Sequence, residues 1–134
     1  MTIEKQLEQF LLSPVFAVIG ASTNRDKYGN KVLRCYQQND RPVIPVNPKE
    51  KQIEGINCVA SVADLPAEVE SISVITPPEI TKKIVKQAAA KGIKNIWMQP
   101  GAESPAAVKY CAGQGINIIA DGSCLLVVLR YHEG

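Results

Sequence analysis

An apolar run that stops at a glycine is the feature of this sequence with the clearest chemical potential. Residues 15–19 are Val-Phe-Ala-Val-Ile, and Gly20, Ala21 and Ser22 follow directly. Such a run is typical of a buried parallel strand, and a glycine after it lets the backbone turn tightly beside a ligand. If a helix begins after the turn, its free N–H groups and positive dipole end favour a phosphate. The stretch therefore predicts a phosphate-binding turn that closes on Arg25.

Four further turns of unusual composition follow apolar runs later in the sequence. They are Asn47-Pro48-Lys49, Thr76-Pro77-Pro78, Gln99-Pro100-Gly101 and Asp121-Gly122-Ser123-Cys124. Ligands of parallel α/β sheets bind outside the carboxyl ends of the strands, where the strand order reverses. We therefore expect these turns to meet the first one and to form a single binding site.

The spacing of these turns requires a sheet whose strands alternate with helices. We expect strands over residues 15–19, 41–46, 71–75, 93–98 and 116–120, and helices over 2–12, 29–39, 79–91 and from Ser104-Pro105 onward. This alternation implies right-handed parallel units with helices on both faces of the sheet. The predicted fold is α/β: a single Rossmann-like three-layer domain over residues 1–134, with a mostly parallel five- to six-stranded sheet. An N-terminal helix within residues 1–14 is expected to pack on it.

Three segments give a less regular pattern. Pro45 removes a donor from the second strand and predicts a short or irregular strand. Residues 49–57 are polar and predict a connection that turns at Glu54-Gly55. Residues 125–129 are apolar but too few to distinguish a strand from a helix. That run either returns to its own sheet or pairs two chains as a homodimer.

Composition excludes several classes of function. The 134 residues carry a net charge of +2, too small for nucleic acid as the main partner, and no window approaches the roughly 18 apolar residues of a membrane span. The four cysteines form no C-x-x-C pair and the chain has one histidine, so we expect no metal site. Acidic residues at positions 4 and 8 are not typical of a signal peptide, which predicts a cytoplasmic protein with free thiols.

A dinucleotide is the usual ligand of such a first turn, but the sequence departs from its fingerprint. The pattern G-x-G-x-x-G would place glycines where Ser22 and Arg25 stand. It would also require a carboxylate after the second strand, where Lys49 stands instead. A cation there favours a phosphate on the adenosine ribose. NAD is therefore disfavoured, and NADP and coenzyme A remain.

Six short motifs occur in order along the chain. They are Val18-Ile19-Gly20-Ala21-Ser22, Tyr28-Gly29-Asn30-Lys31, Val46-Asn47-Pro48, Asp64-Leu65-Pro66, Thr76-Pro77-Pro78, and Trp-Met-Gln-Pro-Gly-Ala-Glu-Ser over residues 97–104. With these motifs the chain, from Val15 to about Val128, resembles the small stand-alone CoA-binding proteins. Those proteins are similar in turn to the N-terminal domain of the succinyl-CoA synthetase alpha subunit.

The resemblance implies a protein that binds coenzyme A or an acyl-CoA and lacks a complete catalytic apparatus. It implies that the first turn wraps the diphosphate, that Lys49 meets the 3′-phosphate and that Thr76-Pro77 stands beside the adenine or the bend of the ligand. Gln99-Pro100-Gly101 would lie along the pantetheine arm. The implied binding residues are Gly20, Ala21, Ser22, Thr23, Asn24, Arg25, Lys31, Asn47, Pro48, Lys49, Thr76, Pro77, Pro78, Gln99, Pro100 and Gly101.

Some of these residues keep a second interpretation. Arg25 and Lys49 can also be interpreted as solvated surface cations. The segment Tyr28 to Lys31 either adds a phosphate contact through Lys31 or Asn30, or is only the start of a helix that contains a glycine. Cys124 matches a family cysteine near the CoA thiol and gives a thiol-active alternative, but a small buried residue is the simpler reading. An NADP-binding oxidoreductase is the remaining alternative.

Overall fold

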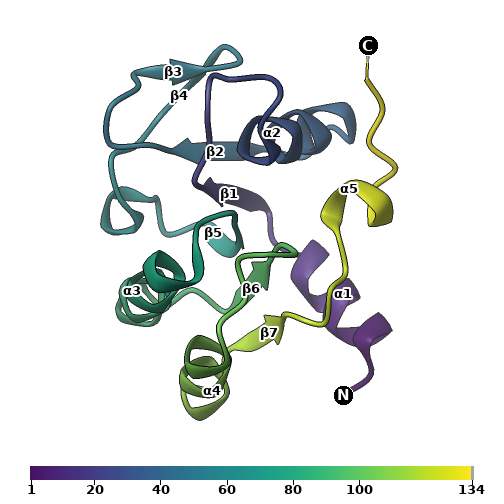
Figure 1. Ribbon diagram of the computed structural model, residues 1–134, viewed down its shortest axis with the longest axis vertical. Helices are drawn as coiled ribbons and strands as arrows, with labels where there is room; N and C mark the ends of the chain where they lie inside the picture. Colours follow the sequence, from purple (N-terminus) through teal and green to yellow (C-terminus); the bar gives the residue numbers. More distant parts are fainter. Residues whose placement is uncertain (134) are drawn as a thin grey trace.

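A five-stranded parallel sheet forms the middle layer of the computed structural model, which describes residues 1–133 (Figure 1). The strand order is β2-β1-β5-β6-β7, and every neighbouring pair is parallel. The order reverses between β1 and β5, which is where such sheets bind ligands. The strands are β1 (Val15–Ile19), β2 (Val43–Val46), β5 (Val69–Val74), β6 (Asn95–Met98) and β7 (Asn117–Ile119).

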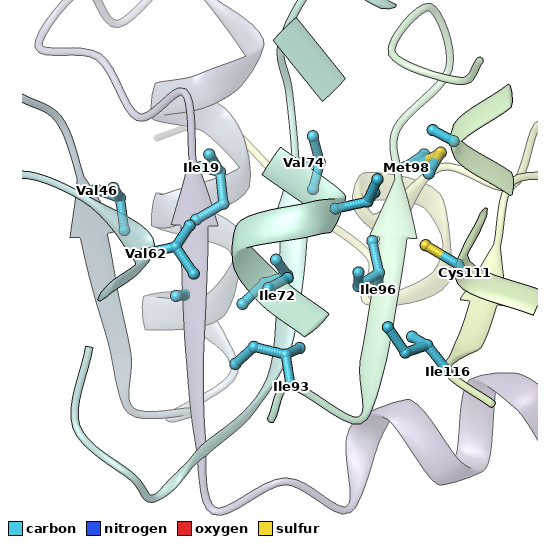
Figure 2. Close-up of a cluster of buried hydrophobic side chains, with 14 of the residues drawn as sticks. Ile19, Val46, Val62, Ile72, Val74, Ile93, Ile96, Met98, Cys111 and Ile116 are labelled. Carbon is cyan, nitrogen blue, oxygen red and sulfur yellow. The ribbon is translucent and has the colours of Figure 1, made fainter. Parts of the chain in front are cut away.

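Helices cover both faces of this sheet, so the predicted three-layer α/β fold is confirmed. Side chains of β1 alternate between two apolar clusters: Phe16 and Val18 pack under the first face, and Ala17 and Ile19 under the second. Figure 2 shows the second cluster. The first face carries α1 (Ile3–Leu11), α2 (Tyr28–Gln38) and α5 (Leu125–Val128), and the second carries α3 (Pro78–Lys91), α4 (Pro105–Gly113) and the short 3-10 turn η1 (Val62–Asp64).

The ends of the longer helices follow from local capping. The Thr2 hydroxyl accepts from the N–H of Lys5 at 3.3 Å, and the Ser104 hydroxyl accepts from that of Ala107 at 3.3 Å. Gly92 ends α3 in the left-handed region at φ 86°. The predicted limits of α1, α2 and α3 therefore lie within one residue of the observed ones. No helix in residues 1–133 is long and apolar enough to cross a membrane.

Of the two alternatives expected from Pro45, a short or an irregular strand, the structure has the first: β2 has only four residues and no irregularity. β2 is an edge strand, and Pro45 pairs with Val18 of β1 in regular parallel register. The Pro45 carbonyl accepts from the N–H of Val59 at 3.1 Å, and the N–H of Asn47 donates to the Val59 carbonyl at 3.0 Å. The proline nitrogen therefore faces away from β1, on the side where a missing N–H breaks no ladder bond.

The polar connection expected over residues 49–57, with its turn at Glu54-Gly55, contains a hairpin that the sequence did not reveal. β3 (Gln52–Ile53) and β4 (Ile56–Asn57) pair as a short antiparallel hairpin. The turn is made by Glu54 and Gly55, both at positive φ (49° and 79°), as a two-residue hairpin turn requires. Two-residue strands are too short to show alternation, so the pattern could not reveal them.

Residues 125–128 form α5, which resolves the ambiguity between strand and helix. Leu125 is fully buried against α2, whereas Val127 is 76% exposed. The run therefore packs in part against its own chain. Pairing of two chains through the exposed residues stays a prediction.

Candidate functional site

Three adjoining cavities lie at the carboxyl ends of the strands, around the reversal of strand order. Gly20, Ala21 and Asn47 line both the central and the outer cavity, and Tyr28 and Ile75 line both the central and the inner one. These shared walls join the three into one site. The central cavity adds Ser22, Asp26, Lys27 and Gly29; the outer one adds Ile19, Val46, Pro48, Ala60, Ser61, Val62, Thr76, Ile80, Ile84 and Gln87; the inner one adds Gln99, Pro100 and Cys124.

Two glycines bring the first turn, the end of β5 and the start of α2 into close contact. Gly20 has φ 93°, and a Cβ on it would overlap the backbone carbonyl of Ile75. A Cβ on Gly29, in the first turn of α2, would overlap the carbonyl oxygen of Gly20 itself. In dinucleotide-binding folds the third glycine of the fingerprint allows this close helix–strand packing. The fingerprint would place this glycine at position 25, where Arg25 stands. Here Gly29, four residues later, takes the same packing role.

The first turn lines the central cavity, and several of its backbone N–H groups have no partner in residues 1–133. The N–H of Asn24 donates to the Ser22 hydroxyl at 3.0 Å, and that of Asp26 donates to the Asn24 side-chain oxygen at 3.0 Å. The N–H groups of residues 21–23 donate to no acceptor within the described residues. The first N–H groups of α2 lie in the wall of the same cavity, and such groups have no partner within their own helix. This arrangement suits an anion.

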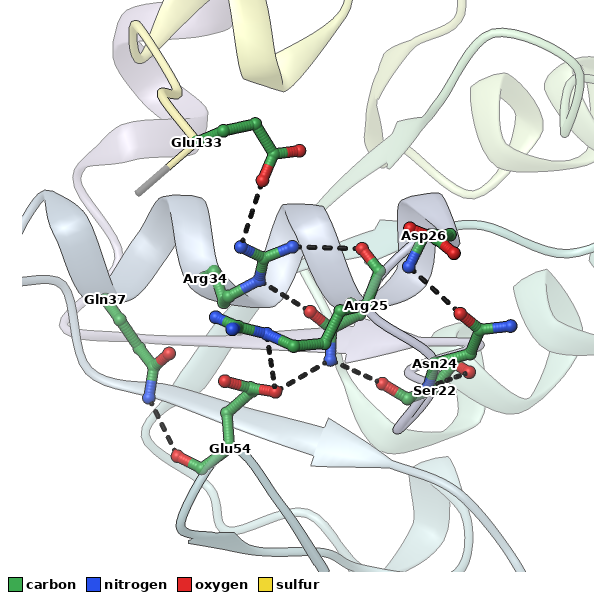
Figure 3. A network of polar contacts seen from close by, with 9 residues as sticks. Ser22, Asn24, Arg25, Asp26, Arg34, Gln37, Glu54 and Glu133 are labelled. Carbon is green, nitrogen blue, oxygen red and sulfur yellow. Dashed lines mark hydrogen bonds and ion pairs between the residues drawn. The ribbon is translucent and has the colours of Figure 1, made fainter.

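The carbonyl groups of the turn are turned into the protein by three side chains. Asn47 donates to the Ala21 carbonyl at 2.9 Å, and Asn30 donates to the Ser22 carbonyl at 2.9 Å. Arg34 donates to the Arg25 carbonyl at 3.0 Å (Figure 3). Because the carbonyls are engaged behind the turn, their partial negative charges are kept away from an anion in front of it.

Arg34 is a buried cation that the sequence analysis did not select. Its residue is 7% exposed, and besides the Arg25 carbonyl it donates from Nε to Asn30 at 2.6 Å and from Nη1 to Glu133 at 3.4 Å. Glu54, in the hairpin turn, accepts from Asn30 at 3.0 Å and pairs with Arg25 at 3.5 Å (Figure 3). The only signal in the sequence is that Arg34 follows Asn30 by four residues, on the same helix face.

Of the predicted residues, the structure brings nine to the cavities. These are Gly20, Ala21, Ser22, Asn47, Pro48, Thr76, Gln99, Pro100 and the candidate thiol Cys124. Thr23, Asn24, Arg25, Lys49, Pro77 and Gly101 are exposed beside them in the same turns, and Pro78 is the exposed first residue of α3. Sequence reasoning missed Tyr28 and Ile75 as site residues, because neither an aromatic residue at a helix start nor an isoleucine after a strand carries a ligand signal.

Lys31 lies apart from the cavities. Its ammonium group pairs with Glu133 at 3.5 Å and lies 5.6 Å from the centre of the Tyr28 ring. Asn30 uses its amide group on Ser22 and Glu54 and its oxygen on Arg34. The Asn30 side chain is therefore committed to the protein, and the motif from Tyr28 to Lys31 serves helix entry rather than a second phosphate contact from Asn30.

Cys124 is not the small buried residue that the simpler interpretation expected. It is half-buried and lines the inner cavity, where its sulfur accepts from the Gln99 amide at 3.4 Å. The other amide atom of Gln99 accepts from the N–H of Leu125 at 2.9 Å, so Gln99 is held in place. Cys35 and Cys111 are fully buried, and burial raises the pKa of each thiol to about 11.

The site combines backbone anion donors, apolar walls and one thiol. The residues lining the three cavities include one sulfur nucleophile and no histidine. Within residues 1–133 no three metal-ligating side chains come together. The geometry thus suits an elongated ligand with a phosphate group at its middle and less polar parts on either side.

Comparison with known proteins gives consistent results. A family model described as CoA binding domain matches residues 15–130. ADP-forming acetate–CoA ligase I of Archaeoglobus fulgidus is 31% identical over 88 residues, which are 66% of this chain and only 13% of the ligase. A conserved hypothetical protein from Pyrococcus furiosus superposes with TM-score 0.81 at 37% identity and covers 84% of this chain and 97% of its own. A hypothetical protein from Pyrococcus horikoshii superposes with TM-score 0.87 at 30% identity and covers 95% of this chain and 89% of its own.

Proposed function

The chain belongs to the CoA binding domain family, and from this premise we propose that it binds coenzyme A or an acyl-CoA in the three joined cavities. The observation that carries the proposal is the first turn, which lines the central cavity and has N–H groups without a partner among the described residues, while three of its carbonyls accept hydrogen bonds from side chains. That arrangement favours a diphosphate. The location that we propose is the cytoplasm, where the four free cysteines would stay reduced.

The proposed orientation of the ligand follows from the cavities. The diphosphate takes the central cavity, and the adenosine takes the outer one, beside Thr76 and the 42%-exposed Ile80. The pantetheine arm enters the inner cavity past Gln99 and Pro100 and ends near Cys124. Catalysis by this chain alone is not part of the proposal, since none of the described residues that line the three cavities is a histidine, and Asp26, the one carboxylate among them, lines the central cavity and not the inner one that holds Cys124.

A titration with CoA, dephospho-CoA, NADP and NAD tests this function, together with native mass spectrometry for a co-purified ligand. We expect CoA to bind, and dephospho-CoA to bind about three- to fivefold more weakly, because an exposed lysine–phosphate pair contributes up to about 1 kcal/mol. Lys49→Ala should remove that difference, and Lys51→Ala, an exposed lysine two residues on, should keep it.

The outcomes of this titration separate the hypotheses. Binding of NADP without CoA would overturn the proposed function and favour the oxidoreductase. Equal affinity for CoA and dephospho-CoA would overturn the role of Lys49 alone.

A thiol-active protein is a second candidate, because the Cys124 sulfur lies in the cavity wall and accepts from Gln99. In this reaction the Cys124 thiolate attacks CoA disulfide; a new S–S bond forms, the old one breaks and CoA leaves as its thiolate. We expect an intact-mass increase of one CoA at pH 8, absent in Cys124→Ser and retained in Cys111→Ser. Cys35 and Cys111 should stay unmodified, because burial raises the pKa of both thiols to about 11. A wild-type protein without the adduct would contradict this candidate.

A further inference from the structure

The orientation of peptide groups in the first turn depends on a side chain that contacts no cavity. Arg34 is not among the residues lining the three cavities, yet it holds the Arg25 carbonyl directly at 3.0 Å. Through Asn30, to which it donates at 2.6 Å, it is also linked to the Ser22 carbonyl. The two ends of the turn that would hold the diphosphate are thus tied to a single guanidinium group.

We propose that Arg34 is a positioning residue for the diphosphate: it keeps the carbonyls of Ser22 and Arg25 behind the turn, so that the N–H groups stay in front. The inference rests on the proposed function, since it concerns the same ligand. If a peptide plane in this turn rotated, its carbonyl oxygen would point at the phosphate and its N–H group would point away from it. Arg34 acts against that rotation without touching the ligand.

The guanidinium group is suited to this task in a way that an ammonium group is not. It donates in three directions from one rigid plane, from Nε to Asn30, from Nη2 to the Arg25 carbonyl and from Nη1 to Glu133. Its charge is balanced by Glu133, which is 63% exposed, so that a buried cation is not left without a counter-ion. Tyr131 lies with its ring 5.5 Å from the guanidinium carbon and covers it. A lysine at this position retains the charge but cannot reach Asn30 and the Arg25 carbonyl in one plane.

Arg34→Lys, compared with Arg41→Lys, tests the proposal. Arg41 also donates to a backbone carbonyl, that of Leu11 at 3.0 Å, and lies over an aromatic ring, but it precedes β2 and so lies at the amino end of the strands, away from the cavities at their carboxyl ends. The affinity of each variant is measured for CoA and for adenosine 3′-monophosphate, which carries the adenosine end without the diphosphate. Thermal unfolding shows whether each variant is folded.

We expect Arg34→Lys to raise the Kd for CoA at least about tenfold, the range of a charged hydrogen bond. The Kd for adenosine 3′-monophosphate should change by less than about twofold, because that ligand has no diphosphate to bind the N–H groups of the turn. Arg41→Lys should leave both affinities unchanged. Equal losses for both ligands, or no loss for CoA, would overturn the inference while leaving CoA binding by the wild type intact. Failure of the wild type to bind CoA would instead overturn the proposed function.

Amide hydrogen exchange of the ligand-free proteins gives a second readout that does not depend on the affinity of any ligand. In Arg34→Lys, exchange should accelerate at Asn24 and Asp26, whose N–H groups donate to side-chain oxygens within the turn, and remain as in the wild type over β5 and β6. Unchanged exchange in the turn, or acceleration spread evenly over the chain, would contradict a positioning role.

Discussion

Replacing Gly29 by alanine should destabilise the protein, although alanine is the better helix former. In an open helix this change gains about 1 kcal/mol. Here the added Cβ would overlap the Gly20 carbonyl oxygen, so α2 must move away from the turn. Overpacking of this kind typically costs about 1–3 kcal/mol net. We therefore expect a midpoint of thermal unfolding lower by roughly 3–12 °C, and a weaker affinity for CoA because the start of α2 leaves the central cavity.

Gly113→Ala is the matched control. Gly113 is also helical, lies at the end of α4, and has no atom within 4 Å of where a Cβ would stand. This variant should be as stable as the wild type or gain up to about 1 kcal/mol. If calorimetry or urea unfolding finds Gly29→Ala at least as stable as Gly113→Ala, the close packing of α2 on the turn is refuted.

Replacing Ser22 by aspartate should nearly abolish binding of CoA. The Ser22 hydroxyl accepts from the N–H of Asn24 at 3.0 Å, and an aspartate oxygen can accept the same bond, so the turn keeps its shape. The new charge would lie in the wall of the central cavity. Two unit charges about 5 Å apart repel by about 3 kcal/mol at an effective dielectric constant near 20. We expect the Kd for CoA to rise by at least about thirtyfold in isothermal titration.

Ser22→Asn separates charge from shape in this experiment. Its side-chain oxygen can accept the same hydrogen bond, and it is neutral. The asparagine variant should bind CoA within about threefold of the wild type, since it loses no charge-assisted contact. Should the two variants weaken binding equally, size rather than charge would be responsible, and the diphosphate would not lie at this turn.

The sequence predicts the frame of the site well because the frame depends on strong periodic signals. β1 is predicted residue for residue, since an unbroken apolar run ends at Gly20. The meeting of the turns after β1, β2, β5 and β6 follows from parallel topology alone. The hairpin at residues 52–57 and the face taken by α5 were not predictable, because each involves too few residues for a period to appear.

The supporting side chains could not be predicted for a different reason. Arg34 shares a face of α2 with Asn30, opposite to the apolar stripe, and in the sequence it resembles an ordinary exposed cation of a helix. What makes it special is its contact with the carbonyl of Arg25 and with Glu133, 99 residues away. Lys31, in contrast, carries the positive charge that suits a phosphate, but its ammonium group pairs with the same distant residue, Glu133. Contacts between segments far apart in sequence decide both cases.

The way the sheet ends at its two edges limits how copies of this chain can associate. At β2, Pro45 offers no N–H, and the segment around Val59 already occupies the outer side. At β7, Gln6 of α1 donates to the Ile118 carbonyl at 2.8 Å and occupies the exposed edge. An open strand edge is the usual starting point for strand addition and aggregation. Since both edges carry such contacts, we expect any pairing of two chains to use a helical surface such as the exposed side of α5 rather than strand addition.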